Sequence, residues 1–171
     1  MSRIAGSIAD VWLQDVRRQY LPIIATVVAC LVDLLPIVVT TPLIPDFGFM
    51  VLIAWRLLRP EMWVATTALP LGLFNDLVAG PPLGQSMALW TIVFLAFDVM
   101  DARLVWRDYW IDWFAAALAI LLYTFGCWYI GWLMGSRINI AVVLPQLGLS
   151  ILAYPLVARL VLALDRWRLA R

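Results

Sequence analysis

Five long apolar runs dominate this chain of 171 residues, and they cover residues 21–40, 62–80, 83–102, 109–134 and 142–164. About 20 helical residues cross the hydrocarbon core of a bilayer, which is roughly 30 Å thick, so each run is long enough to cross as a helix. The sequence is 65% hydrophobic and 13% charged, whereas soluble domains are about 45–50% apolar and about 25% charged. Lipid must therefore cover much of the surface, and the chain is predicted to be an all-α polytopic membrane protein.

A sixth apolar run, Phe47–Leu58, has only 12 residues. Runs of about 10–14 residues are often buried or re-entrant instead of spanning. The placement of arginine decides between these alternatives, because cytoplasmic loops are enriched in basic residues. If the short run crosses, eleven arginines fall on one side and only Arg137 falls on the other; if it does not, the count becomes four to eight. The sequence thus predicts six transmembrane helices with both termini in the cytoplasm.

These runs also define the predicted division of the chain. Residues 21–164 are predicted to form the six-helix transmembrane domain, and residues 165–171 a cytoplasmic tail. Residues 1–20 are predicted to form a cytoplasmic interfacial segment, because apolar residues at helical spacing, such as Ile4 and Ile8, share one face. A frayed tail is the alternative for this segment.

Polar side chains inside a span need a reason, since an acid there costs about 2.5–3.5 kcal/mol on insertion scales. Asp33 lies in the first run, and Asn75 and Asp76 lie toward the outer end of the 62–80 run. That run also has small residues at steps of three or four, including Gly72, which let a neighbouring backbone approach closely. The preferred interpretation is that Asp76 accepts hydrogen bonds from loop amides around Gly80–Gly84. A contact with a ligand or a partner protein is the alternative.

The opposite, predicted cytoplasmic ends of the helices carry charges of both signs. Long arginine side chains can place their charged heads at the membrane interface beside acidic groups. The sequence therefore predicts an ion-pair layer at this end, and a docking surface for a partner is the alternative. The residues of the layer are Arg56, Arg59, Arg103, Arg107, Asp98, Asp101, Asp108 and Asp112.

Catalysis, a metal and a cofactor have little support in the sequence. There is no His and no Lys, so the usual bases that activate Ser or Cys nucleophiles are missing. The two cysteines, Cys30 and Cys127, lie in separate apolar runs, and no phosphate-binding loop or zinc motif is present. An aspartate dyad of Asp33 and Asp76 is the remaining enzymatic alternative. The net charge of +1 gives no indication of a nucleic-acid partner.

Residues 44–97 contain an ordered series of motifs. Pro45 precedes the short apolar run, which contains Leu52-Ile53-Ala54-Trp55 and is followed by Arg59-Pro60. The series continues with Leu71-Gly72-Leu73-Phe74-Asn75-Asp76-Leu77, then Gly80, then Pro82-Leu83-Gly84. In order and spacing this stretch resembles the core of the MreD family of rod-shape-determining membrane proteins.

The resemblance implies a non-enzymatic scaffold in the bacterial inner membrane, within the cell-elongation (Rod) complex. It implies direct binding of the periplasmic scaffold MreC and a part in coupling MreB filaments to peptidoglycan synthesis and rod shape. RodZ, RodA and a class B penicillin-binding transpeptidase would be further members of the complex, and membrane lipids would surround it.

The resemblance also implies a fold similar to the six-helix substrate-binding components of energy-coupling-factor vitamin transporters. That similarity raises an alternative function. The chain would then be a small-molecule or lipid-binding or transport component, with a pocket near Asp33 and Asp76.

Overall fold

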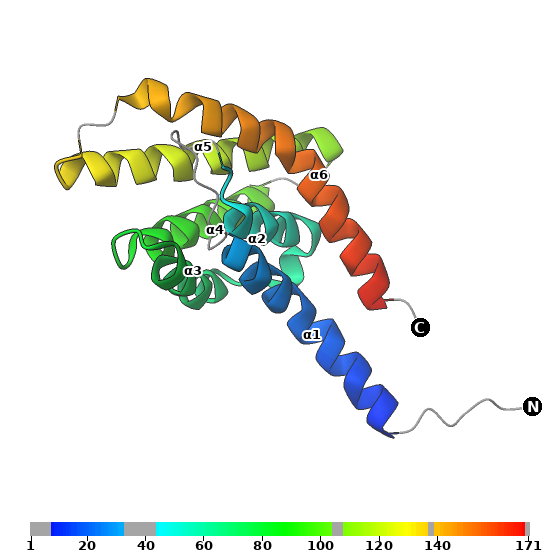
Figure 1. The fold of residues 1–171 in the computed structure, drawn as a ribbon. Coiled ribbons are helices and arrows are strands. Elements are labelled where there is room, and N and C mark those ends of the chain that lie inside the picture. Colours follow the sequence, from blue (N-terminus) through cyan, green and yellow to red (C-terminus); the bar gives the residue numbers. More distant parts are fainter. Residues whose placement is uncertain (1–7, 33–43, 104–107, 137–138, 170–171) are drawn as a thin grey trace, which may run out of the picture.

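The computed structural model describes residues 8–32, 44–103, 108–136 and 139–169. Over these ranges it contains six α-helices, no strand and two short 3-10 turns, η2 (Pro60–Met62) and η3 (Ile140–Val142). The α-helices are α1 (Ile8–Leu31), α2 (Phe47–Leu58), α3 (Ala65–Ala79), α4 (Gln85–Arg103), α5 (Tyr109–Leu133) and α6 (Leu144–Leu169) (Figure 1). The predicted all-α class is confirmed, and the six helices fall on the six apolar runs.

Helix α1 continues without a break through residue 20, where the sequence predicts that an interfacial segment gives way to the first span. Pro22 lies inside this helix, and its carbonyl oxygen accepts a hydrogen bond of 2.9 Å from Thr26 Oγ1. The later part of the 21–40 run, including Asp33, lies outside the described residues. The division of the chain at residue 20 stays a prediction.

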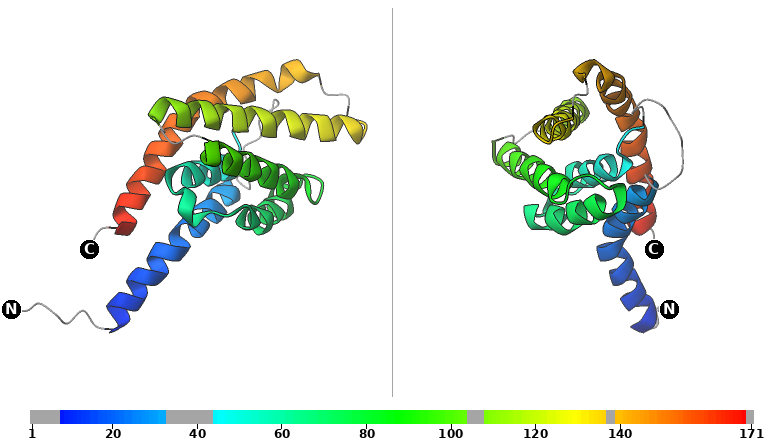
Figure 2. Two further views of the ribbon diagram at one scale, coloured as in Figure 1. Left: turned by 180° about the vertical axis from the view of Figure 1, so that it is seen from behind. Right: turned by 60° about the vertical axis from the view of Figure 1, so that its left-hand side comes forward.

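Successive helices run in alternating directions. At one end of the bundle, Arg56 near the end of α2 contacts Asp98 near the end of α4. At the other end, Gln146 near the start of α6 donates a hydrogen bond of 2.8 Å to the carbonyl of Ile44, which precedes α2. The start of α1 and the end of α6 lie on the same side of the molecule in every view (Figures 1 and 2).

Helix α2 forms the centre of the structure, and its ten residues from Gly48 to Leu57 are all buried. It packs against α1, α5 and α6, and the ring of Phe49 lies 5.8 Å from that of Trp90 in α4. At about 1.5 Å per residue, α2 is about 18 Å long, which is shorter than the hydrocarbon core. Protein therefore surrounds this helix, as is typical of a helix that is apolar on all sides.

The other helices have apolar outward faces. Three segments of the described chain, α4, α5 and residues Ile140–Leu169, are long and apolar enough to cross a membrane. Large apolar patches of this kind mark surfaces that lipid or a partner protein covers. Exposed side chains on these faces include Ile92, Leu95, Val99, Leu118, Leu122, Leu152, Leu156 and Leu160.

Helix α5 also has aromatic side chains at the positions expected of a membrane span. Tyr109 and Trp110 are exposed at its start, and Tyr129 and Trp132 are exposed near its end. Tyr and Trp rings concentrate at both membrane–water interfaces. The 22 positions from Trp110 to Trp132 correspond to about 33 Å along a helix, which matches the hydrocarbon thickness of roughly 30 Å.

Helices α3 and α4 pack backbone against backbone at Gly72. A Cβ atom at this position would lie 2.5 Å from the Cα of Met87 and 2.7 Å from its backbone nitrogen. Ala68, one turn earlier in α3, is also buried. The predicted close approach along the small residues of α3 is confirmed at Gly72.

We expect Gly72→Ala to destabilise the protein by about 1–3 kcal/mol, because the added methyl group meets backbone atoms of α4. Gly148→Ala is the matched control: a Cβ at this position in α6 has no atom within 4 Å, and Ala favours a helix by about 0.5–1 kcal/mol relative to Gly. Thermal unfolding in detergent should show a lower Tm for Gly72→Ala only. Equal Tm values for the two variants would contradict the close packing.

Candidate functional site

Asp76, near the end of α3, caps the start of α4. Its Oδ1 accepts a hydrogen bond of 2.8 Å from the Ser86 N–H. Its Oδ2 accepts hydrogen bonds of 2.8 Å from the Gly84 N–H and 3.4 Å from the Met87 N–H. The N–H groups at a helix start have no partner within the helix and favour a negative charge. The structure thus has Asp76 in the role that the sequence favours, and contact with a partner or ligand stays a prediction.

Two glycines shape the turn between α3 and α4. Gly80 ends α3 with a φ of 79°, and its N–H donates a hydrogen bond of 3.3 Å to the Asp76 carbonyl. Gly84 has a φ of 92° just before α4 begins. Side chains with a Cβ rarely adopt such positive φ values. Asp76 therefore caps α4, and the two glycines provide the positive φ angles that the turn between α3 and α4 requires.

Replacement of Asp76 should destabilise the protein to an extent that depends on the oxygen atoms that remain. Asp76→Ala leaves three N–H donors without their acceptor, of which that of Ser86 is buried and those of Gly84 and Met87 are partly buried, and we expect a loss of about 1–3 kcal/mol. Asp76→Asn keeps one oxygen and should lose less. Glu61→Ala is the control, because the Glu61 side chain is 64% exposed. Thermal unfolding of the four proteins tests the order, and an unchanged Asp76→Ala would contradict the capping role.

A chain of polar side chains leads from this turn to the start of α2. Asn75 Nδ2 donates to Ser86 Oγ over 3.2 Å, and Ser86 Oγ lies 3.4 Å from the Tyr123 hydroxyl. The Tyr123 hydroxyl donates to Asp46 Oδ2 over 2.6 Å. Asp46 Oδ1 in turn accepts from the Phe49 N–H over 2.8 Å, which caps α2. These contacts join α3, α4, α5 and α2.

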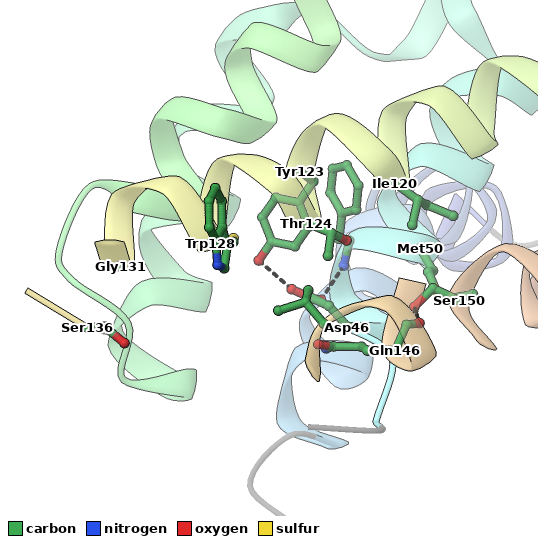
Figure 3. Close-up of a pocket in the computed structure, with 13 residues that line it drawn as sticks. Asp46, Met50, Ile120, Tyr123, Thr124, Trp128, Gly131, Ser136, Gln146 and Ser150 are labelled. Carbon is green, nitrogen blue, oxygen red and sulfur yellow. Dashed lines mark hydrogen bonds between the residues drawn. The ribbon is translucent and has the colours of Figure 1, made fainter. Parts of the chain in front are cut away.

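A cavity of about 270 Å³ lies beside Asp46, between α2, α5 and α6 (Figure 3). The sequence predicts a pocket near Asp33 and Asp76, but the residues that line this cavity are others. They are Asp46, Phe49, Met50, Ile120, Tyr123, Thr124, Cys127, Trp128, Gly131, Ser136, Val143, Gln146 and Ser150. Among the described lining residues, aromatic, aliphatic and neutral polar side chains thus surround a single carboxylate.

Arg56 forms ion pairs at the opposite end of the bundle. Its Nη2 lies 2.6 Å from Asp98 Oδ1, and its Nη1 lies 2.8 Å from Asp101 Oδ2. Its guanidinium also lies 5.9 Å from the centre of the Phe94 ring. These predicted partners therefore meet, and they tie the end of α2 to the end of α4. The cytoplasmic location of this layer stays a prediction.

Arg59 pairs with an acid that the predicted layer did not include. Its Nε and Nη2 donate to Asp165 Oδ2 over 3.2 and 2.8 Å. Hydrogen bonding to Asp165 raises the pKa of Arg59 above its ordinary value, so the guanidinium stays charged. Arg168 Nη2 lies 2.6 Å from the other oxygen, Asp165 Oδ1. The predicted tail 165–171 thus begins inside α6, which continues to Leu169.

The other predicted layer residues are placed differently. Arg103 is exposed at the end of α4, and Asp108 is exposed just before α5. Asp112 lines a second cavity of about 140 Å³, together with Arg159. Arg107, like Asp33, lies outside the described residues. The ion-pair role of Arg107 and the pairing of Asp33 with Asp76 therefore stay predictions.

Three polar residues of the site were not predicted from the sequence, although each lies in a sequence context that indicates a structural role. Asp46 directly precedes an apolar run, which is typical of a helix N-cap. Tyr123 and Gln146 place a hydroxyl and an amide inside long apolar runs, where polar groups need partners. The sequence does not predict the contact between Asp46 and Tyr123.

The Arg56 ion pairs should respond asymmetrically to mutation. The Arg56 side chain is 3% exposed, whereas those of Asp98 and Asp101 are 44% and 24% exposed. The double variant Asp98→Asn, Asp101→Asn leaves a buried cation without an anionic partner, which we expect to cost about 3–5 kcal/mol. Arg56→Met leaves two acids that water reaches, and it should cost less. Chemical unfolding of both variants tests this order, and the reverse order would contradict it.

A comparison with models of protein families gives a match over residues 15–166, which is most of the chain. The matching family is described as rod shape-determining protein MreD. A search of curated proteins and a search of solved structures gave no match. The resemblance indicated by the motifs in residues 44–97 is thus confirmed over a much longer stretch.

Proposed function

Because the chain belongs to the MreD family of rod shape-determining proteins, we propose that it is a non-enzymatic membrane scaffold of the bacterial cell-elongation (Rod) complex. In this proposal it binds MreC directly and helps to couple MreB filaments to peptidoglycan synthesis and rod shape. RodA, RodZ and a class B penicillin-binding transpeptidase are further members of the complex. The family match is the observation that carries the proposal.

The use of polar groups within the fold supports a scaffold role. Both carboxylate oxygens of Asp76 accept hydrogen bonds from backbone N–H groups at the start of α4, and the ion pairs of Arg56 connect α2 to α4. The turn between α3 and α4 is also short, since α3 ends at Ala79 and α4 begins at Gln85. At this turn, helix faces and helix ends are therefore the surfaces on which the protein would contact its partners.

We further propose that all six helices cross the inner membrane, with both termini in the cytoplasm. The Arg56 and Arg59 ion pairs lie at the end of the bundle toward which α6 runs, and the Asp76 turn lies at the other end. An arginine-rich end is typical of the cytoplasmic side. The alternating helix directions and the aromatic rings of α5 support the same arrangement.

The second candidate function is a small-molecule or lipid-binding or transport component, with a fold similar to the substrate-binding components of energy-coupling-factor transporters. The cavity of about 270 Å³ beside Asp46 is the observation that favours it. Asp76 is a poor pocket residue, because three backbone N–H groups already occupy its carboxylate. For the same reason, it is a poor member of an aspartate dyad.

Affinity purification tests the scaffold proposal. The tagged protein, isolated from cross-linked membranes and again in mild detergent, should carry MreC with it, while an unrelated multi-pass membrane protein with the same tag should not. Depletion of the protein should convert rods into round cells. An unchanged cell shape together with no recovery of MreC would contradict the proposal.

A further inference from the structure

The Asp46 carboxylate is partly buried at the start of α2. Its partner Tyr123 precedes the exposed Trp132 by nine positions, or about 13 Å along α5. Because Trp rings mark the membrane interface, the hydroxyl that bonds Asp46 lies well inside the level of Trp132. An ionisable group at such depth is a functional-site candidate when its charge is not matched by a nearby counter-ion.

Within the described part of the chain, the hydrogen-bond partners of Asp46 are neutral donors. One oxygen accepts from the Phe49 N–H and the other from the Tyr123 hydroxyl. Among the described residues, those that line the cavity beside it include no arginine, whereas the acids Asp98, Asp101 and Asp165 at the other end of the bundle all pair with arginine. The described part of the lining therefore holds one acidic side chain, Asp46, whose carboxylate disfavours an anionic ligand and favours a cationic one.

The walls of the cavity suit an organic cation. The rings of Phe49 and Tyr123 are stacked with their centres 4.3 Å apart, and Trp128 and Ile120 add apolar surface. Aromatic rings attract ammonium groups. The volume of about 270 Å³ exceeds that of a cavity of about 150 Å³ that holds benzene, so a ring with a short alkyl chain fits.

From this geometry we propose that the cavity beside Asp46 binds an organic ammonium group, which contacts the Asp46 carboxylate while its apolar body lies against Phe49, Tyr123 and Trp128. The ammonium group belongs either to a free amine or to the headgroup of an amine-bearing lipid. This site does not depend on the scaffold role. It rests on the second candidate function, that of a small-molecule or lipid-binding component, and specifies organic ammonium compounds as its ligands.

Three probes of similar size and different charge test the site: 2-phenylethylamine, neutral 2-phenylethanol and anionic 3-phenylpropanoate. Calorimetry on the purified full chain in detergent should show the amine binding at least tenfold more tightly than the alcohol, and no binding of the propanoate. Asp46→Asn should reduce the amine to the affinity of the alcohol. Asn remains a good N-cap, so the cap on α2 is kept.

Three further variants keep this result interpretable. Thr124→Leu fills the cavity without touching the carboxylate, so both the amine and the alcohol should bind at least tenfold more weakly. Glu61→Gln removes an exposed acid outside the cavity and should change nothing. Arg137→Gln removes the arginine that follows the lining residue Ser136 in the sequence, and amine binding should be unchanged.

Native mass spectrometry from nanodiscs separates the two sources of the amine. If the wild type retains phosphatidylethanolamine in preference to phosphatidylglycerol and Asp46→Asn does not, the ligand is a lipid headgroup. If the protein binds the amine without this lipid preference, the ligand is a free amine. Equal affinity for all three probes, or an Asp46→Asn variant that binds the amine like the wild type, would overturn the proposal. Recovery of MreC is a separate measurement, so failure of the site leaves the scaffold role untouched.

Discussion

A helix of 12 residues is too short to cross a bilayer in contact with lipid, and the arrangement of the other helices follows from this constraint. Helix α2 has ten consecutive buried residues, so the longer helices must surround it and present their own apolar faces outward. Its two ends are partly buried in protein and have polar partners there. Asp46 with Tyr123 serves one end, and the ion pairs of Arg56 and Arg59 serve the other.

Two levels of polar contacts, one at each end of α2, therefore hold the bundle together. The arginine level fixes the ends of α2, α4 and α6 against one another. At the other level, the Asp76 cap fixes α3 against α4, and the polar chain through Tyr123 extends to α2. The cavity beside Asp46 lies at this second level, so a ligand there would contact α2, α5 and α6 together.

Local patterns in the sequence predict a large part of this structure. Hydropathy yields six helices, five of them close to their observed bounds; α1 begins at Ile8, well before the predicted run 21–40. The spacing of small residues yields the contact at Gly72. The Asp76 cap follows because its donors lie only 8 to 11 positions away. In contrast, Tyr123 and Asp46 are 77 positions apart, and Arg59 and Asp165 are 106 apart. Such contacts depend on which helices are neighbours, which hydropathy does not specify.

Cysteine labelling tests the central role of α2 most directly. The starting protein carries Cys30→Ala and Cys127→Ala. Into it we would introduce one cysteine at a time, either Glu61→Cys after α2 or Leu83→Cys after α3. Both positions are well exposed, with 64% of the Glu61 side chain and 72% of Leu83 accessible. If α2 crosses the membrane within its protein shell, a membrane-impermeant maleimide will label Leu83→Cys from the periplasmic side, and Glu61→Cys only after the membrane is opened. Labelling in the reverse order would contradict the account.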